Sequence, residues 1–161
     1  MKEFYLYIYM QSKSLHKKGS FNKTKKIRAT KKPKYSEERI VLTFLEMLNT
    51  VKLYHWKTRS YPQHKATDEL YSKLNENIDS FVEIMLGKTG GRVNLTNMKC
   101  LPLHDYNSLS PFKTKVDEYK SFLVNMTSDA RVNITNNSDL LNVRDELLGN
   151  MNQFSYLLTF H

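Results

Sequence analysis

Apolar residues recur at intervals of three and four along four segments of the chain, and this period constrains the fold more than any other feature. The first segment begins at Ser36-Glu37-Glu38, where Ser36 can cap a helix and the glutamates favour its positive end. The second begins at Pro62 or Gln63, the third at Ser110-Pro111 and the fourth near Asn137. No segment shows strand-type alternation of apolar and polar residues, so the pattern predicts an all-α chain.

The connections between these segments differ in length. The first helix is expected to end near Arg59-Ser60-Tyr61-Pro62, because the residue before a proline avoids helical angles. The second is expected to stop at Gly87 or at Gly90-Gly91. Residues 88–111 then form a long connection without a clear period. Two short connections and one long one predict a four-helix bundle with a crossover between helices two and three, the ferritin-like arrangement, over residues 36–161.

The basic residues are concentrated at the N-terminus. The chain has 25 Lys and Arg against 16 Asp and Glu, a formal charge of +9. Residues 4–36 hold ten basic residues and no acidic one, whereas residues 37–161 hold 14 basic and 15 acidic residues. Residues 1–35 are therefore predicted to be a mostly disordered basic arm in front of a near-neutral body.

A lysine-rich arm without acidic residues favours nucleic acid, since flexible cations neutralise phosphates and release counterions without reading sequence. The residues expected to contact DNA are Lys17, Lys18, Lys23, Lys25, Lys26, Arg28, Lys31, Lys32 and Lys34. A solvated tail without a role and a nuclear-localisation signal are the other interpretations of this arm.

Other features exclude classes of protein. No apolar run approaches the roughly 20 residues that span a bilayer. The aromatic segment at residues 4–10 is short and lacks a cleavage site, so we expect no signal peptide and an intracellular chain, cytoplasmic or associated with DNA. The single cysteine, Cys100, permits neither an internal disulfide nor a cysteine-based zinc cluster.

Four residues of the second helix could bind a metal. His64 and Asp68 are spaced i, i+4, as are Asp79 and Glu83, and all four fall on one face of a helix beside its apolar stripe. A histidine with several carboxylates suits iron(II), manganese(II) or zinc better than copper(I) or calcium. The alternative interpretation is an ordinary solvated face.

The spacing of the two pairs points to a shared site. Asp68 and Asp79 are separated by about 16 Å along a helix, so one helix cannot wrap both pairs around one ion. Two antiparallel copies can, if a two-fold axis passes near Lys73 and Leu74. The sequence therefore predicts a homo-oligomer with two equivalent intersubunit sites, provided that these residues are ligands.

The segment from Tyr54-His55-Trp56 through His64-x3-Asp68 to Asp79-x3-Glu83 resembles the ferroxidase signature of the Dps family, the DNA-binding ferritin-like proteins of starved cells. The chain is most similar to Dps-like proteins of large DNA viruses, for which a location in the virion is a further expectation. The gap from His55 to His64 is three residues shorter than in typical members, which predicts a tighter turn.

The resemblance implies a hollow dodecamer that oxidises iron(II), preferentially with hydrogen peroxide, stores the ferric product and protects DNA. His55, His64 and Asp68 would come from one subunit and Asp79 and Glu83 from its neighbour. Trp56 would be a redox residue beside the site, and no organic cofactor is implied.

Two other functions remain open at this stage. One is a catalytically inactive Dps-like protein that compacts DNA or builds a virion. The other is a nickel- or manganese-dependent enzyme on the same bundle, which would usually use Glu-x-x-His ligands that this sequence lacks.

Overall fold

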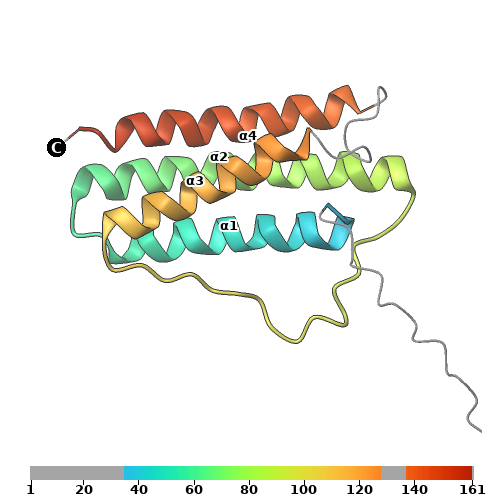
Figure 1. Ribbon diagram of the computed structural model, residues 1–161, viewed down its shortest axis with the longest axis horizontal. Helices are drawn as coiled ribbons and strands as arrows, with labels where there is room; N and C mark the ends of the chain where they lie inside the picture. Colours follow the sequence, from blue (N-terminus) through green and yellow to red (C-terminus); the bar gives the residue numbers. More distant parts are fainter. Residues whose placement is uncertain (1–34, 128–136, 161) are drawn as a thin grey trace, which may run out of the picture. The chain divides into compact units, whose positions relative to one another are not determined.

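The computed structural model describes residues 35–127 and 137–160, which form four α-helices and no strand within those ranges. The helices are α1 (Glu37–Lys57), α2 (Tyr61–Thr89), α3 (Leu109–Met126) and α4 (Ser138–Leu157). The predicted all-α fold with four helices is confirmed (Figure 1). The prediction of a disordered basic arm falls on residues outside the described ranges.

The helices lie side by side, and the crossover sets their directions. α2 runs back along α1, a long connection then returns to the end where α2 began, and α3 runs in the same direction as α2 before α4 reverses again (Figure 1). α2 packs most extensively, against α4 and α1, whereas α1 and α3 have the least contact. The predicted crossover between helices two and three is confirmed, and it contains turns but no helix. None of the described helices is both long and apolar enough to cross a membrane.

Local signals explain where the helices begin and end. The Ser36 side chain accepts a hydrogen bond from the backbone N–H of Arg39 and caps α1 as predicted. α2 starts at Tyr61, one residue earlier than expected, with Pro62 in its first turn. It continues through Gly87, because the left-handed residue that ends it is Gly90, with φ of 67°.

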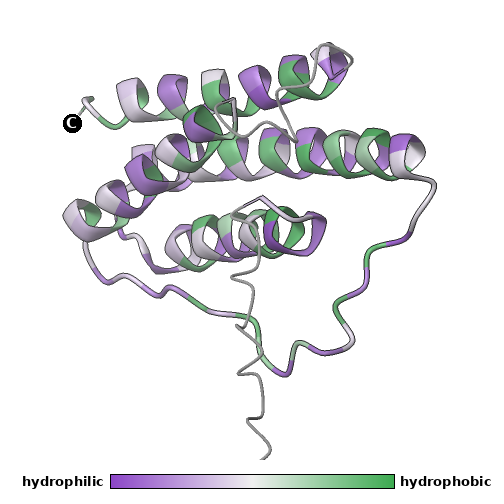
Figure 2. Cartoon of the chain, turned by 45° about the vertical axis from the view of Figure 1, so that its right-hand side comes forward, coloured by the Kyte–Doolittle hydropathy of each residue, from purple (hydrophilic) through white to green (hydrophobic). Residues whose placement is uncertain are grey.

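The core consists of the apolar stripes of the four helices, and its largest fully buried side chains include Phe44, Phe81, Phe112 and Phe154. Phe44 of α1 packs edge-on against Phe81 of α2, and Phe112 of α3 does so against Phe154 of α4. Tyr54 stacks on Phe112 at a centroid distance of 4.0 Å and joins α1 to α3. In Figure 2 each helix carries hydrophobic residues on part of its surface and hydrophilic residues on the rest, as amphipathic packing requires.

A buried arginine joins the last two helices. Arg144 of α4 is 7% exposed and donates from one guanidinium nitrogen to the backbone carbonyl of Leu123 at 3.1 Å, near the end of α3. The same nitrogen contacts the hydroxyl of Thr127, and Nε pairs with Asp145 at 2.9 Å. The cation thus satisfies a carbonyl at the negative end of α3.

Candidate metal site

A turn of only three residues brings two predicted ligands together. α1 ends at Lys57 and α2 begins at Tyr61, so the predicted tight turn is confirmed. Across it the imidazole rings of His55 and His64 stack with centroids 3.9 Å apart and an interplanar angle of 21°. His55 is buried, whereas His64 is exposed, so the pair reaches from the core to the surface.

The two histidines bind each other's backbone. Nδ1 of His55 lies 3.1 Å from the carbonyl oxygen of His64, and Nδ1 of His64 lies 3.1 Å from the carbonyl oxygen of His55. A carbonyl oxygen can only accept, so both Nδ1 atoms must carry the proton. In each neutral ring the lone pair then lies on Nε2, the atom left to bind a metal.

Asp68 lies near one of the two histidines, His55. Its Oδ1 lies 3.8 Å from Nε2 of His55, and its side chain is about half exposed. Two imidazoles and one carboxylate form a ligand set that suits iron(II) and related divalent ions. The structure therefore brings together His55 with His64 and His55 with Asp68, in keeping with a half-site.

A glutamine holds the turn in shape. Oε1 of Gln63 accepts hydrogen bonds from the hydroxyl of Tyr54 at 2.8 Å and from the hydroxyl of Thr58 at 2.9 Å. Thr58 in turn accepts from the backbone N–H of Ser60. Burial raises the pKa of Tyr54 and outweighs the opposing hydrogen bond from Thr58, so this phenol remains a donor. The clamp ties the last turn of α1 to the first turn of α2, where the histidines lie.

The second predicted pair of ligands, Asp79 and Glu83, lies apart from His55, His64 and Asp68. Both side chains are exposed on α2, as are those of His64 and Asp68. Within the described ranges, no three His, Cys, Asp or Glu side chains of a single chain cluster closely enough to hold a metal ion. A complete set of these ligands would need a second copy.

The two-fold position near Lys73 and Leu74 stays a prediction. The side chain of Leu74 is fully buried in the subunit core, so it cannot contribute to a contact between subunits. Lys73 points towards α4, with Nζ 2.7 Å from Glu69 and 3.1 Å from Gln153. The contact with Gln153 lies on the side of α2 that faces α4.

An exposed aromatic residue follows His55 on α1. Trp56 is 69% exposed, in the turn of α1 that also holds His55. Lys52 places its ammonium 5.8 Å from the Trp56 ring and 4.5 Å from the ring of Tyr71 on α2. Leu45 is 36% exposed and lies about 20° from Trp56 around the axis of α1. Lys52 thus links Trp56 of α1 to Tyr71 of α2.

The structure also contains a polar cluster that sequence reasoning missed. Glu46 of α1 is 7% exposed, and its Oε1 lies 3.0 Å from Nζ of Lys115, from the hydroxyl of Tyr119 and from Nε2 of His104. His104 belongs to the crossover, and the other two belong to α3. Lys57 secures the crossover a second time through Asp105 at 2.6 Å and Asn107 at 3.0 Å.

The ionisation of this cluster follows from its contacts. Burial alone would raise the pKa of Glu46, but the bonds from Lys115 and Tyr119 and the nearby cations outweigh it and lower the pKa. Burial likewise opposes the charge of Lys115, yet its carboxylate partners raise the pKa of its ammonium. Burial raises the pKa of Tyr119 strongly, and the adjacent Glu46 adds to the effect.

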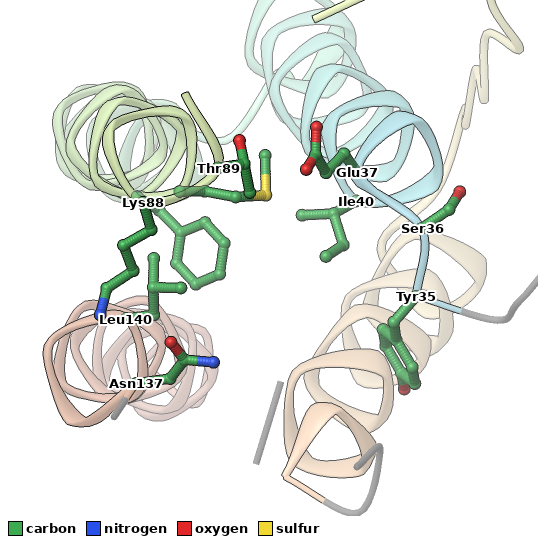
Figure 3. A pocket seen from close by; sticks show the side chains of 10 residues that line it. Tyr35, Ser36, Glu37, Ile40, Lys88, Thr89, Asn137 and Leu140 are labelled. Carbon is green, nitrogen blue, oxygen red and sulfur yellow. The ribbon is translucent and has the colours of Figure 1, made fainter. Parts of the chain in front are cut away.

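A cavity of about 310 Å³ lies at the opposite end of the bundle, where α1 and α4 begin and α2 ends (Figure 3). Its wall includes Ile40, Phe81, Met85 and Leu140, and Lys88 and Thr89 lie at its polar margin. None of the predicted metal ligands lines it. The cavity is thus separate from the candidate metal site.

Comparison with known proteins places the chain in a family. Residues 55–158 match the sequence profile of DUF5856, described as a family of unknown function. The chain belongs to this family. The matched region begins at His55 and includes all five predicted metal ligands, whereas residues 1–54 lie outside it. No curated protein and no solved structure matches the chain.

Proposed function

We propose that this DUF5856 protein is a Dps-like iron(II) oxidase and store whose metal sites form between two subunits. His55, His64 and Asp68 of one subunit would bind iron(II) as substrate together with Asp79 and Glu83 of a second copy. The observation that carries the proposal is the pair of stacked imidazoles, whose Nδ1 atoms are both engaged by backbone carbonyls. Their Nε2 atoms are thereby available to a metal.

The surface beside the half-site supports a second copy as partner. Asp79 and Glu83 are exposed on one face of α2, and Trp56 is exposed on α1. An isologous contact over this face would cover exposed apolar surface and bring the two ligand pairs together twice. The dodecamer implied by the resemblance is the larger assembly that we propose from such dimers.

The proposed reaction balances without an organic cofactor. Two iron(II) ions each lose one electron, and one hydrogen peroxide molecule takes both electrons and two protons to give two water molecules. Carboxylate ligands favour the ferric product, because the harder and more highly charged ion gains more from anionic oxygens. Trp56 would lie beside the metals and could donate an electron to reactive intermediates.

The central experiment removes the half-site and leaves the core intact. The variant His64→Ala with Asp68→Ala is expected to lose peroxide-dependent iron(II) oxidation, followed by ferric absorbance, and to keep its helical circular dichroism. A matched control is Glu76→Ala with Asn77→Ala, which lies on the same helix outside the ligand set. An unchanged oxidation rate in the first variant would falsify the site.

A mixing experiment tests whether the site is shared between subunits. The double variants His64→Ala/Asp68→Ala and Asp79→Ala/Glu83→Ala are each expected to be inactive alone. When they are co-expressed in equal amounts, a mixed dimer keeps one complete site, so about a quarter of the wild-type activity should return. If the mixture stays inactive while the wild type turns over, the ligands belong to one subunit.

The arm supplies the proposed contact with DNA. Deletion of residues 1–35 leaves a body with a net charge near −1, which has little attraction for phosphate. The truncated protein is expected to lose retardation of duplex DNA in a gel, whereas the full chain should bind with a strong dependence on salt. Equal binding by both proteins would remove the arm from the proposal.

The runner-up function is a protein that compacts DNA or builds a virion without turnover. An assembled, DNA-binding protein that fails to oxidise iron(II) with either peroxide or oxygen would establish it. Iron assays combined with mass determination in solution therefore separate the two functions.

A further inference from the structure

Within the part of the chain that the structure describes, Thr67 is the only residue whose side-chain hydroxyl contacts the ring of His55. Its Oγ1 lies 3.2 Å from Nδ1 of His55, and the residue is fully buried. Thr67 is one position before Asp68 on α2, on the core side of the helix. The contact is therefore shielded from water.

The proton of the Thr67 hydroxyl is already engaged. Oγ1 lies 2.7 Å from the carbonyl oxygen of Gln63 and 3.0 Å from that of His64, and both of these oxygens can only accept. A hydroxyl has a single proton, so its oxygen is left to accept from Nδ1 of His55. The threonine and the His64 carbonyl thus form a pair of acceptors for one imidazole N–H.

We infer that Thr67 is a positioning residue that keeps His55 in the tautomer with its proton on Nδ1 and its Nε2 lone pair directed towards Asp68. This inference rests on the proposed function for its purpose, because the tautomer matters for a metal bound at Nε2. The tautomer itself is a property of the metal-free protein, so it can be measured without a bound metal. Outer partners of this kind fix ring orientation and change metal affinity.

The isosteric variant Thr67→Val removes the acceptor and preserves volume. In uniformly ¹⁵N-labelled, metal-free, full-length protein at pH 8, long-range ¹H–¹⁵N spectra report the tautomer of each neutral histidine. The His55 signals are identified by their loss in His55→Gln. We expect the Nδ1–H tautomer in the wild type and in Thr67→Ser, and in Thr67→Val a measurable population of the Nε2–H tautomer, because the His64 carbonyl is then the one acceptor left for Nδ1–H.

Affinity for cobalt(II), a probe that does not require turnover, gives the second measurement. Thr67→Val is expected to bind it about tenfold more weakly than the wild type, and Thr67→Ser should bind as the wild type does. The matched control is Thr43→Val, because Thr43 is also a buried helical threonine. Its hydroxyl donates to the carbonyl oxygen of Arg39, four residues earlier, at 2.8 Å.

The outcomes separate this inference from the proposed function. An unchanged tautomer in Thr67→Val, or equal impairment of Thr67→Ser and Thr67→Val, would overturn the role of the hydroxyl. A shifted tautomer in a protein whose wild type does not oxidise iron(II) would support the inference and contradict the proposed function. If cobalt(II) does not bind, the spectra of the metal-free protein still decide the role of Thr67.

Discussion

Glu46 and His55 lie on the same helix, and each is buried within a polar cluster, yet the two clusters differ in what they leave unsatisfied. Around Glu46 three donors converge on one carboxylate oxygen, so charge is balanced within the subunit. Around His55 and His64 the backbone engages Nδ1 of each ring, while Nε2 is left for a further partner. Burial of a polar group alone therefore does not identify a binding site. The closed cluster is expected to hold the fold, and the open one to bind a ligand.

The largest expected effect on stability comes from opening the closed cluster. Glu46→Ala removes the buried carboxylate on which Lys115, Tyr119 and His104 converge and leaves Lys115 with only the exposed Glu118, which should cost about 3 kcal/mol of unfolding free energy. His64→Ala/Asp68→Ala should cost only about 1 kcal/mol, since both side chains are exposed. Urea unfolding of the two variants measures the difference. Equal losses would show that the clusters are not distinct in their structural role.

A smaller effect distinguishes two ion pairs of different exposure, Lys115–Glu46 between α3 and α1 and Lys57–Asp105 between α1 and the crossover. Lys115→Met breaks the ion pair with Glu46, whose two side chains are 15% and 9% exposed, and should cost about 2 kcal/mol of unfolding free energy. Lys57→Met breaks the pair with Asp105, whose side chains are 38% and 48% exposed, and should cost about 0.5 kcal/mol because solvent screens it. Thermal unfolding of both variants at matched pH gives the comparison. A greater loss in Lys57→Met would contradict the ranking of the two ion pairs by their exposure.

The smallest effect appears only at the extremes of pH. The lowered pKa of Glu46 contributes stability that is present above its ordinary value of 4.5 and is lost as pH falls through the folded-state value. The raised pKa of Lys115 contributes stability below 10.5 that is lost as pH rises through its folded-state value. The difference in unfolding free energy between wild type and Glu46→Gln should therefore shrink from pH 5 to pH 3. A constant difference over this range would contradict the assigned ionisation.

Sequence periodicity predicted the elements of this fold well, because helix faces and caps are local. The Ser36 cap and the helical periods require only residues within a few turns of each other. Glu46 could not be recognised in this way, since its partners His104 and Tyr119 lie 58 and 73 residues further along the chain. Arg144 was equally hidden, because its acceptor Leu123 belongs to another helix. Contacts that depend on tertiary packing leave no period in the sequence.

The candidate site was predictable in part for the same reason. The i, i+4 spacing of His64 and Asp68 and the nearness of His55 across a short turn are local features. The reciprocal bonds to backbone carbonyls, the Gln63 clamp and the contribution of Thr67 depend on how closely α1 and α2 approach. The role of Asp79 and Glu83 depends on a second chain and stays a prediction.

The bond from His64 to the carbonyl of His55 also acts on the helix that accepts it. This carbonyl belongs to the last turn of α1, where carbonyls have lost their partners within the helix, so the imidazole serves as a C-terminal cap supplied by the next helix. A cation bound at Nε2 would withdraw electron density from the ring and make Nδ1–H a stronger donor. Loading of the site would then tighten the end of α1, and protection of the amides in its last turn from hydrogen exchange would report occupancy directly.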